Sequence, residues 1–330
     1  MRFFSSNNAF HFIFLPLTVL ILWFYPLFNY QTINIAHIEN EGILYSLMVD
    51  SFSDTPFLFI MINLVVVLFT AIYINLLHAR YVFFENRTVL QSYLYVLFTS
   101  IIIYISPVHP GFITTFFLIP VVHNILASYK GEKQLTNIFF SGFFLAVACL
   151  FYIPVFWLIV PVWIGYFILT NNGLRIILLS ITGFITVYVY VFAYYLYKKD
   201  IIHILYDLES TANVLKLSES IIPIYILSGL FLVLLILSIY IIIKGESRQK
   251  IKSWKYLIFL SVAVIINLIL FIILKDTGVL IPFFVFSGIL ISNYFTLKKY
   301  HVFKQISFIL VFILSLWIAF YPYIHLYIKI

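Results

Sequence analysis

The sequence predicts an all-α protein, built as a polytopic bundle of about eleven membrane-spanning helices. Of its 330 residues, 64% are hydrophobic and only 9% are charged, whereas soluble domains have about 45–50% apolar and about 25% charged residues. A water-soluble core has no room for so much apolar surface, so we expect lipid to surround most of the chain. The run 226–244 is apolar on every side and lacks the alternation expected of barrel strands.

Eleven apolar runs approach the roughly 20 residues that cross about 30 Å of hydrocarbon. Short polar breaks separate them, and they lie at 11–29, 56–77, 89–106, 111–128, 137–153, 155–171, 175–196, 220–243, 254–274, 279–296 and 305–328. The first run follows Arg2 and has no small-residue cleavage site after it, so we expect it to be retained as a span rather than removed as a signal peptide.

The run 137–171, which contains Pro154 and Pro161, reads either as one kinked helix or as a pair. The distribution of charged residues over the two sides of the membrane decides between one kinked helix and a pair of helices. With the N-terminus inside and eleven spans, fourteen of the nineteen Lys and Arg residues lie on the inner side, and nine of the twelve Asp and Glu residues lie outside. A single crossing would move the basic cluster 244–255 outside, against the positive-inside bias. We therefore predict two short helices that turn near residues 152–154.

The chain 1–330 is predicted to form one integral membrane domain. Two outer segments are long enough to hold structure of their own. The first, 30–55, joins the first two spans. The second, 197–219, has apolar positions spaced as in an amphipathic helix on the outer membrane surface.

Several function classes are excluded by what the sequence lacks. The spans contain almost no ionisable residue, which argues against a transporter driven by protons or sodium. No Gly-rich phosphate loop, H-E-x-x-H or G-x-S-x-G motif occurs, so we expect no ATPase or dinucleotide domain, no cofactor and no metal. The single cysteine, Cys149, rules out an intrachain disulfide. The basic residues follow membrane topology, and we expect membrane lipids rather than nucleic acid as partners.

The chemistry is therefore assigned to the outer side, where we expect turns from several spans to converge. Glu41 and Glu39 are the candidate catalytic residues, because a partly desolvated carboxylate can take a proton from an attacking hydroxyl. Lysines and histidines on the same side would hold a phosphate leaving group. The candidate substrate-binding residues are His37, Asp50, His109, Lys198, Lys199 and Lys275. The plainer interpretation is that outer loops must be polar and that acidic residues gather there through topogenesis alone.

The stretch 39–45, Glu-Asn-Glu-Gly-Ile-Leu-Tyr, resembles the first outer loop of the GT-C-type polytopic glycosyltransferases, in which an acidic motif after the first helix provides the catalytic carboxylate. The stretch 142–154, Gly-Phe-Phe-Leu-Ala-Val-Ala-Cys-Leu-Phe-Tyr-Ile-Pro, resembles a helix that these enzymes place after a basic inner loop. The resemblance implies a GT-C-like bundle that transfers sugar from a polyprenyl-phosphate donor at the outer face. The chain departs from that pattern in its Glu-x-Glu spacing and in having no outer arginine.

A second resemblance is to uncharacterised bacterial multi-pass inner-membrane proteins. Residues 2–8 carry it, together with Gly142, the sequence Leu-Phe-Tyr-Ile-Pro at 150–154, Arg175 and Gly183. It implies the bacterial inner membrane, in which the orientation predicted from the charges places the N-terminus in the cytoplasm and the C-terminus in the periplasm.

Three functional hypotheses stay open. The first is the glycosyltransferase. The second is a non-enzymatic subunit of an envelope-assembly or secretion complex, with other membrane proteins as partners. The third, weaker, is a lipid or polysaccharide flippase, for which the spans offer few polar residues.

Overall fold

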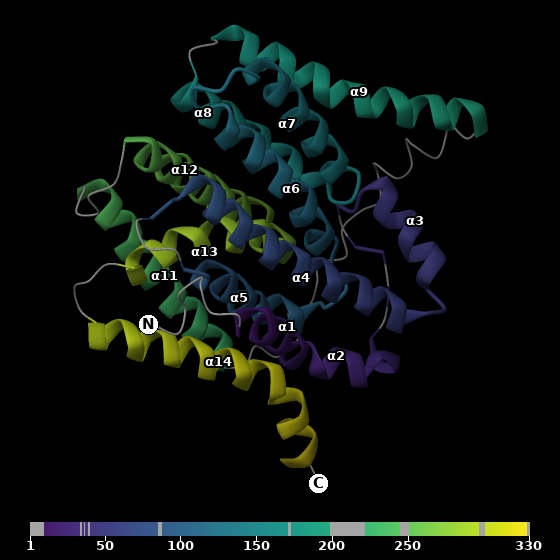
Figure 1. Ribbon diagram of the computed structural model, residues 1–330. Coiled ribbons are helices and arrows are strands. Elements are labelled where there is room, and N and C mark those ends of the chain that lie inside the picture. Colours follow the sequence, from purple (N-terminus) through teal and green to yellow (C-terminus); the bar gives the residue numbers. More distant parts are fainter. Residues whose placement is uncertain are drawn as a thin grey trace. The chain divides into compact units, whose positions relative to one another are not determined.

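The computed structural model describes residues 10–33, 35, 37–38, 40–84, 88–170, 173–198, 222–244, 251–296 and 301–328. Within these ranges the regular elements are all helices, and no strand occurs (Figure 1). The all-α prediction is therefore confirmed. The predicted amphipathic segment 197–219 lies, apart from its first two residues, outside the described residues.

Seven helices in the described part of the chain are long and apolar enough to cross a membrane, which is compatible with a multi-pass membrane protein. They are α4 (Pro56–Tyr81), α6 (Pro110–Ala127), α9 (Leu174–Lys198), α11 (Ile222–Lys244), α12 (Ile251–Leu274), α13 (Leu280–Thr296) together with the turn η4 (Thr277–Val279), and α14 (His301–Ile328).

The other four predicted spans coincide with shorter helices. They are α1 (His11–Leu22) followed by α2 (Phe24–Phe28), α5 (Leu90–Ile105), α7 (Gln134–Cys149), and η3 (Ile153–Leu158) followed by α8 (Ile159–Leu169). The 16 residues of α5 cover about 24 Å at 1.5 Å per residue, which is less than the full hydrocarbon thickness. Every predicted apolar run thus holds a helix, while the number that crosses the bilayer stays a prediction.

The run 137–171 is divided into two helices, as predicted. Its first helix, α7, ends at Cys149, and Tyr152 has an extended backbone. Pro154 lies in the first turn of η3, where its missing N–H costs no helical hydrogen bond. Proline is tolerated in the first turn of a helix but not in its interior, which explains why a new helix begins here and α7 does not continue.

The described chain folds into two compact units. Unit 1 comprises 1–34, 55–112 and 217–330, and unit 2 comprises 35–54 and 113–216. The prediction that the whole chain acts as one membrane domain is not tested by this division.

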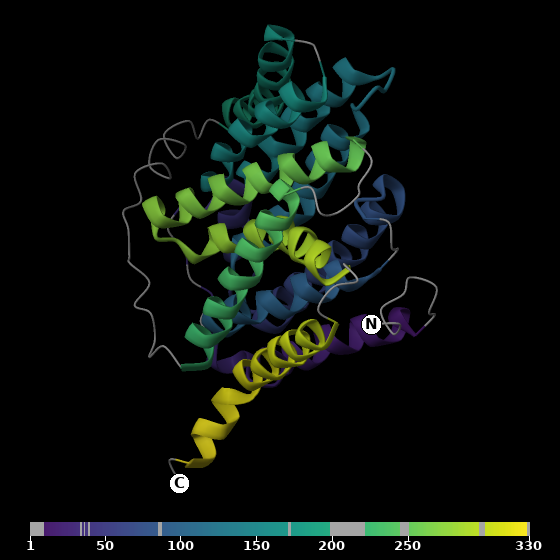
Figure 2. The ribbon, with the colours of Figure 1, turned by 90° about the vertical axis from the view of Figure 1, so that its left-hand side faces the viewer.

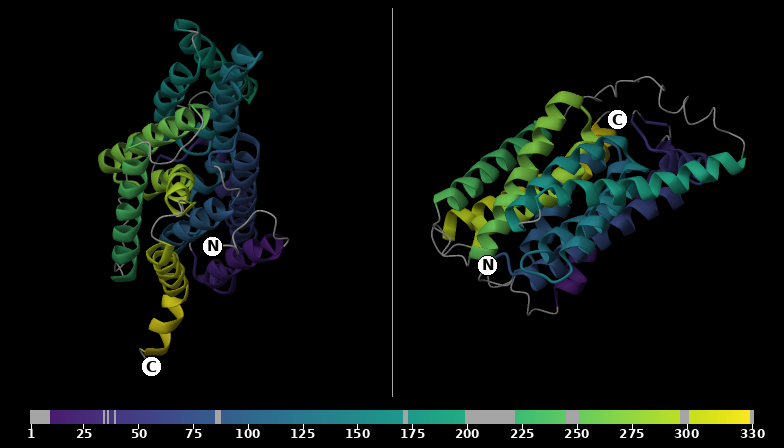
Figure 3. Two further views of the ribbon diagram at one scale, coloured as in Figure 1. Left: turned by 60° about the vertical axis from the view of Figure 1, so that its left-hand side comes forward. Right: turned by 90° about the horizontal axis from the view of Figure 1, so that it is seen from above.

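In unit 1, helices α5 and α13 occupy the centre. Nearly every residue of both is buried, and α13 packs against α5, α11 and α12. Figures 2 and 3 show α11, α12 and α13 as neighbouring green and yellow-green ribbons. Several buried polar groups of this core form hydrogen bonds, which membrane-embedded polar groups need in the absence of water. For example, the Ser92 hydroxyl donates to the carbonyl of Ala71 (2.6 Å), and the Gln91 amide donates to Asn75 (3.2 Å).

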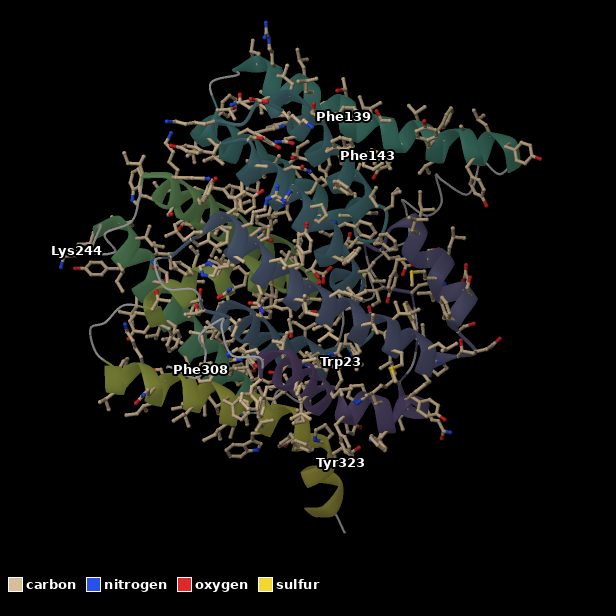
Figure 4. The ribbon with its side chains drawn as sticks, in the orientation of Figure 1. Trp23, Phe139, Phe143, Lys244, Phe308 and Tyr323 are labelled. Carbon is tan, nitrogen blue, oxygen red and sulfur yellow. The ribbon has the colours of Figure 1, made fainter. Side chains whose placement is uncertain are left out.

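In unit 2, α7 and α9 form the closest helix pair (Figure 1). A Cβ atom at Gly142 would overlap the carbonyl oxygen of Ser180, and one at Gly183 would overlap the carbonyl of Phe139. The two glycines therefore allow the backbones to touch, the packing mode that small residues give membrane helices. Phe139 and Phe143 lie at this contact (Figure 4).

Candidate functional site

The loop before α3 (Ile43–Phe52), which is predicted to lie on the outer side, is hydrogen-bonded to the turn between α7 and η3 in unit 2. The backbone N–H of Gly42 donates to the carbonyl of Phe151 at 2.9 Å. In the opposite direction, the N–H of Ile153 donates to the carbonyl of Asn40 at 3.0 Å. This pairing is antiparallel, like two residues of a β-ladder, and it fixes the loop to the helical part of the unit.

The local sequence permits this close approach. Asn40 has φ of +60°, a left-handed conformation that asparagine tolerates better than most residues. A Cβ atom at Gly42 would overlap the carbonyl group of Leu150, so only glycine fits there. The stretches 39–45 and 142–154, which carry the resemblance to glycosyltransferases, therefore lie against each other.

Glu41 directly precedes Gly42 at this contact, and each of its two carboxylate oxygens has a hydrogen-bond partner. Its Oε2 accepts a hydrogen bond from the backbone N–H of Ile38 at 3.0 Å, and its Oε1 lies 2.5 Å from Nδ1 of His37. The side chain is only 12% exposed. A carboxylate oxygen accepts more than one hydrogen bond, so Glu41 keeps acceptor capacity for a further proton donor.

His37 lies between two carboxylates. Its Nδ1 faces Glu41, and its Nε2 is 3.4 Å from Oδ1 of Asp50, on α3. The side chains of His37 and Asp50 are mostly exposed, at 57% and 64%. The hydrogen bond to Glu41 raises the pKa of His37 above its ordinary value, and the charges of Glu41 and Asp50 add to this rise, while partial burial opposes it. We refer to His37, Glu41 and Asp50 as the outer cluster, after the side of the membrane on which the sequence predicts them.

Tyr45 supports the outer cluster from within the fold. It lies one helical turn after Glu41 and is completely buried. Burial, and to a lesser degree the charge of Glu41, raises the pKa of Tyr45, so its hydroxyl stays neutral. The first turn of α3 is thereby anchored in the interior of unit 2.

His109, another predicted site residue, belongs to unit 1 and is fully buried. Its Nδ1 accepts a hydrogen bond from the N–H of Gly111 at 3.0 Å, and its Nε2 is 3.6 Å from Oδ1 of Asp276. Asp276 in turn accepts the N–H of Gly278 at 2.9 Å. These bonds hold His109 as the link between the turn before α6 and the turn after α12.

The remaining predicted site residues are spread over both units. Lys275 is exposed at the end of α12, where its φ of +53° and its N–H bond to the carbonyl of Phe271 end the helix. Lys198 is the last residue of α9. Glu39 and Lys199 lie outside the described residues. The structure thus brings together His37, Glu41 and Asp50 of the eight predicted residues, and it leaves the proposed convergence of the other turns untested.

Three participants in these sites were not predicted from the sequence. They are the backbone N–H of Ile38, the buried Tyr45, and Asp276 as the partner of His109. Tyr45 had a readable signal, since it follows Glu41 at the spacing of one helical turn. No sequence signal indicated Asp276, because its pairing with His109 depends on the packing of two turns that are far apart in the sequence. Among the described residues no group of three His, Cys, Asp or Glu side chains is arranged to hold a metal ion.

No protein-family model, no curated protein and no solved structure matches the chain. The assignment of function therefore rests on the sequence and on the geometry of the outer cluster.

Proposed function

We propose that the chain is a bacterial inner-membrane protein with eleven spans, a cytoplasmic N-terminus and a periplasmic C-terminus. Contacts inside each unit support this alternation, because they join ends predicted to lie on the same side. On the predicted outer side of unit 1, Asn29 donates to the hydroxyl of Tyr323 at 3.0 Å. On the predicted inner side, the Ser253 hydroxyl donates to the carbonyl of Val82 at 2.9 Å. In unit 2 the Gly42 bond to the turn after α7 also joins two predicted outer segments.

We further propose that it transfers a sugar from a polyprenyl-phosphate donor to an acceptor hydroxyl at the outer face. The observation that supports this most is the carboxylate of Glu41. It is largely withdrawn from water and oriented by the N–H of Ile38 and by the ring of His37. Such preorganisation is what a catalytic base requires, because the group is already in place when charge develops.

In the proposed step, Glu41 takes the proton of the acceptor hydroxyl. The hydroxyl oxygen forms a bond to the anomeric carbon of the sugar. The bond from that carbon to the phosphate oxygen breaks, and its electron pair leaves with the polyprenyl phosphate. His37 orients the Glu41 carboxylate and, when protonated, offsets the negative charge that develops near Glu41. Lys198, Lys199 and Lys275 remain the candidates for holding the phosphate, whereas His109 is fully buried and does not reach a donor.

A complementation experiment tests the role of Glu41. A strain lacking the gene would receive the wild type, Glu41→Gln or Asp54→Asn, and the lipid-linked and envelope glycans would be profiled by mass spectrometry. Asp54 is an exposed carboxylate of the same outer segment and serves as the matched control. We expect the deletion to lose a glycosylated product, Asp54→Asn to restore it, and Glu41→Gln to leave it missing at normal protein levels. Full restoration by Glu41→Gln would remove Glu41 from the mechanism.

A second candidate function, a non-enzymatic assembly subunit, is favoured by α9. Of the seven long apolar helices, α9 is the least buried, and its tyrosine-rich end exposes Tyr190 and Tyr197. Tyrosine suits an interface better than the interior of a bilayer, so this face is suited to a partner membrane protein. Cross-linking from position 190 to a distinct membrane protein, together with complementation by Glu41→Gln, would favour the subunit. A chain that stays monomeric and uncross-linked would count against it.

A further inference from the structure

A basic and aromatic patch lies in unit 1 where the end of α4 meets the start of α12. It consists of Arg80 and Tyr81 from α4 and of Lys252, Trp254 and Tyr256 from α12. We call these five residues the α4–α12 patch. None of them belongs to the outer cluster, and both helix ends are predicted to face the cytoplasm.

The patch has a rigid base. The Ser253 hydroxyl donates to the carbonyl of Val82 at 2.9 Å and so ties α12 to the residue that ends α4. Val82 is itself left-handed, with φ of +48°, and its N–H donates to the carbonyl of His78 at 2.9 Å. The rings of Tyr81 and Tyr256 meet edge to face, with centroids 5.8 Å apart, and both are buried.

Two cations flank this pair of tyrosines. The guanidinium carbon of Arg80 is 5.9 Å from the centre of the Tyr81 ring, and Nζ of Lys252 is 5.7 Å from the centre of the Tyr256 ring. Both distances fall within the range of cation–π attraction. The side chains of Arg80 and Lys252 are nevertheless exposed, so their positive charges are held in place and remain accessible to a ligand.

Apolar side chains lie beside the cations, and the neighbouring sequence is basic. Trp254 is 43% exposed and Ile251 is 73% exposed, so exposed apolar surface lies beside the charges of Arg80 and Lys252. The adjoining sequences 80–87 and 244–255 contain seven Lys and Arg residues and two Glu residues. A ligand that matches this surface has an anionic head and an apolar tail, and exposed tryptophan is typical of the depth at which lipid headgroups lie.

We propose that the α4–α12 patch binds the phosphate of an anionic membrane lipid, with Arg80 and Lys252 on the headgroup and Trp254 along the acyl chains. Arginine presents a planar fork of donors to phosphate oxygens, and lysine adds a point charge. The site is independent of sugar transfer, because it involves no residue of the outer cluster.

The test uses the full-length protein in neutral detergent, with either phosphatidylglycerol or phosphatidylcholine added to the micelles. Thermal unfolding and native mass spectrometry would report binding. Arg80→Gln/Lys252→Gln removes the two cations. Lys133→Gln/Arg175→Gln is the matched control, since it removes one lysine and one arginine that are exposed on the same predicted side in unit 2. Native mass spectrometry separates folded from unfolded protein by charge state, so lipid is counted on the folded species and a loss of folding is not mistaken for a loss of binding.

We expect phosphatidylglycerol to stabilise the wild type and the control equally, and phosphatidylcholine to have little effect. The Arg80/Lys252 double variant should bind phosphatidylglycerol about tenfold more weakly, and Arg80→Lys/Lys252→Arg should restore binding. An equal loss in both double variants would overturn the site in favour of a diffuse charge effect. Equal stabilisation by inorganic phosphate alone would overturn the lipid as ligand.

Discussion

His37 and His109 each face a carboxylate, but in opposite surroundings. His37 is 57% exposed, and its partner Glu41 is four residues away in the same loop, at 2.5 Å. His109 is fully buried in unit 1, and its partner Asp276 comes from a distant turn, at 3.6 Å. The first pair forms a cluster with Asp50, in which His37 and Asp50 are mostly exposed and Glu41 is largely withdrawn from water. The second is enclosed by the backbone N–H groups of Gly111 and Gly278.

The comparison separates a pair suited to react from a pair suited to hold the fold. A proton can reach or leave His37 directly from solvent, because its side chain is 57% exposed. Around His109 there is no such access, and Gly278 is required because a Cβ atom there would overlap the imidazole ring. Under the proposed function, the same two functional groups would serve chemistry in one place and architecture in the other, and the difference in the burial of the two histidines accounts for this.

The largest effect is expected from breaking the buried pair. Asp276→Ala leaves His109 buried beside an empty space and also removes the acceptor for the Gly278 N–H. We expect the free energy of unfolding to fall by about 3 kcal/mol, measured by denaturant titration in detergent. A fall in the free energy of unfolding of less than about 1 kcal/mol would mean that the buried pair contributes no more than a surface ion pair, and the difference drawn between the two histidines would not hold.

Gly278→Ala should have the next largest effect, because its methyl group would be forced against the ring of His109. Overpacking of this kind costs about 1–3 kcal/mol. Gly229→Ala on α11 is the control, since a Cβ atom there meets nothing within 4 Å, and alanine is the better helix former. Equal destabilisation by the two substitutions would show that the fit around His109 is looser than described.

Glu41→Gln should change the titration of His37 rather than the stability of the protein. Removal of the carboxylate takes away the largest cause of the raised pKa, so the pKa of His37 should fall toward its ordinary value. Nuclear magnetic resonance of labelled histidine, with His37→Gln to assign the signal, measures this directly. A titration curve that Glu41→Gln leaves unmoved would mean that the two side chains do not interact in solution.

The pH dependence of stability follows from the same shift. Because folding raises the pKa of His37 above its unfolded value of about 6.5, its stabilising effect is complete below that pH. It is lost as the pH rises through the higher pKa of the folded state. We expect the wild type to unfold at a slightly higher temperature than His37→Gln at pH 5.5 and at the same temperature at high pH. A difference that grows with pH would contradict this sign.

The smallest effect is expected for Asp50→Asn. Its 3.4 Å contact with His37 lies between two mostly exposed side chains, and such pairs contribute about 0–1 kcal/mol. The melting temperature should change little, and the pKa of His37 should fall less than it does in Glu41→Gln. A larger fall of the His37 pKa in Asp50→Asn than in Glu41→Gln would show that Asp50 contributes more to the raised pKa than Glu41 does.

The apolar composition allowed most of the helices to be predicted, since each of the eleven runs holds one. Proline placed the break after α7 correctly. The outer cluster was also predictable in part, because His37, Glu41 and Asp50 are close in sequence. The central position of α5 and α13 was not predicted, because it depends on which distant spans pack together, and the length and apolar content of each run do not encode this. The pairing of His109 with Asp276 was hidden for a similar reason, since it requires two distant turns to meet.

The most direct test of the outer cluster is turnover by the purified protein with a polyprenyl-phosphate-linked sugar and an acceptor identified from the glycan profile. The quantity to compare is the rate per folded molecule in the wild type and in Glu41→Gln. The account predicts a fall of about a hundredfold or more, with an unfolding temperature close to that of the wild type. A rate in Glu41→Gln equal to that of the wild type would contradict it.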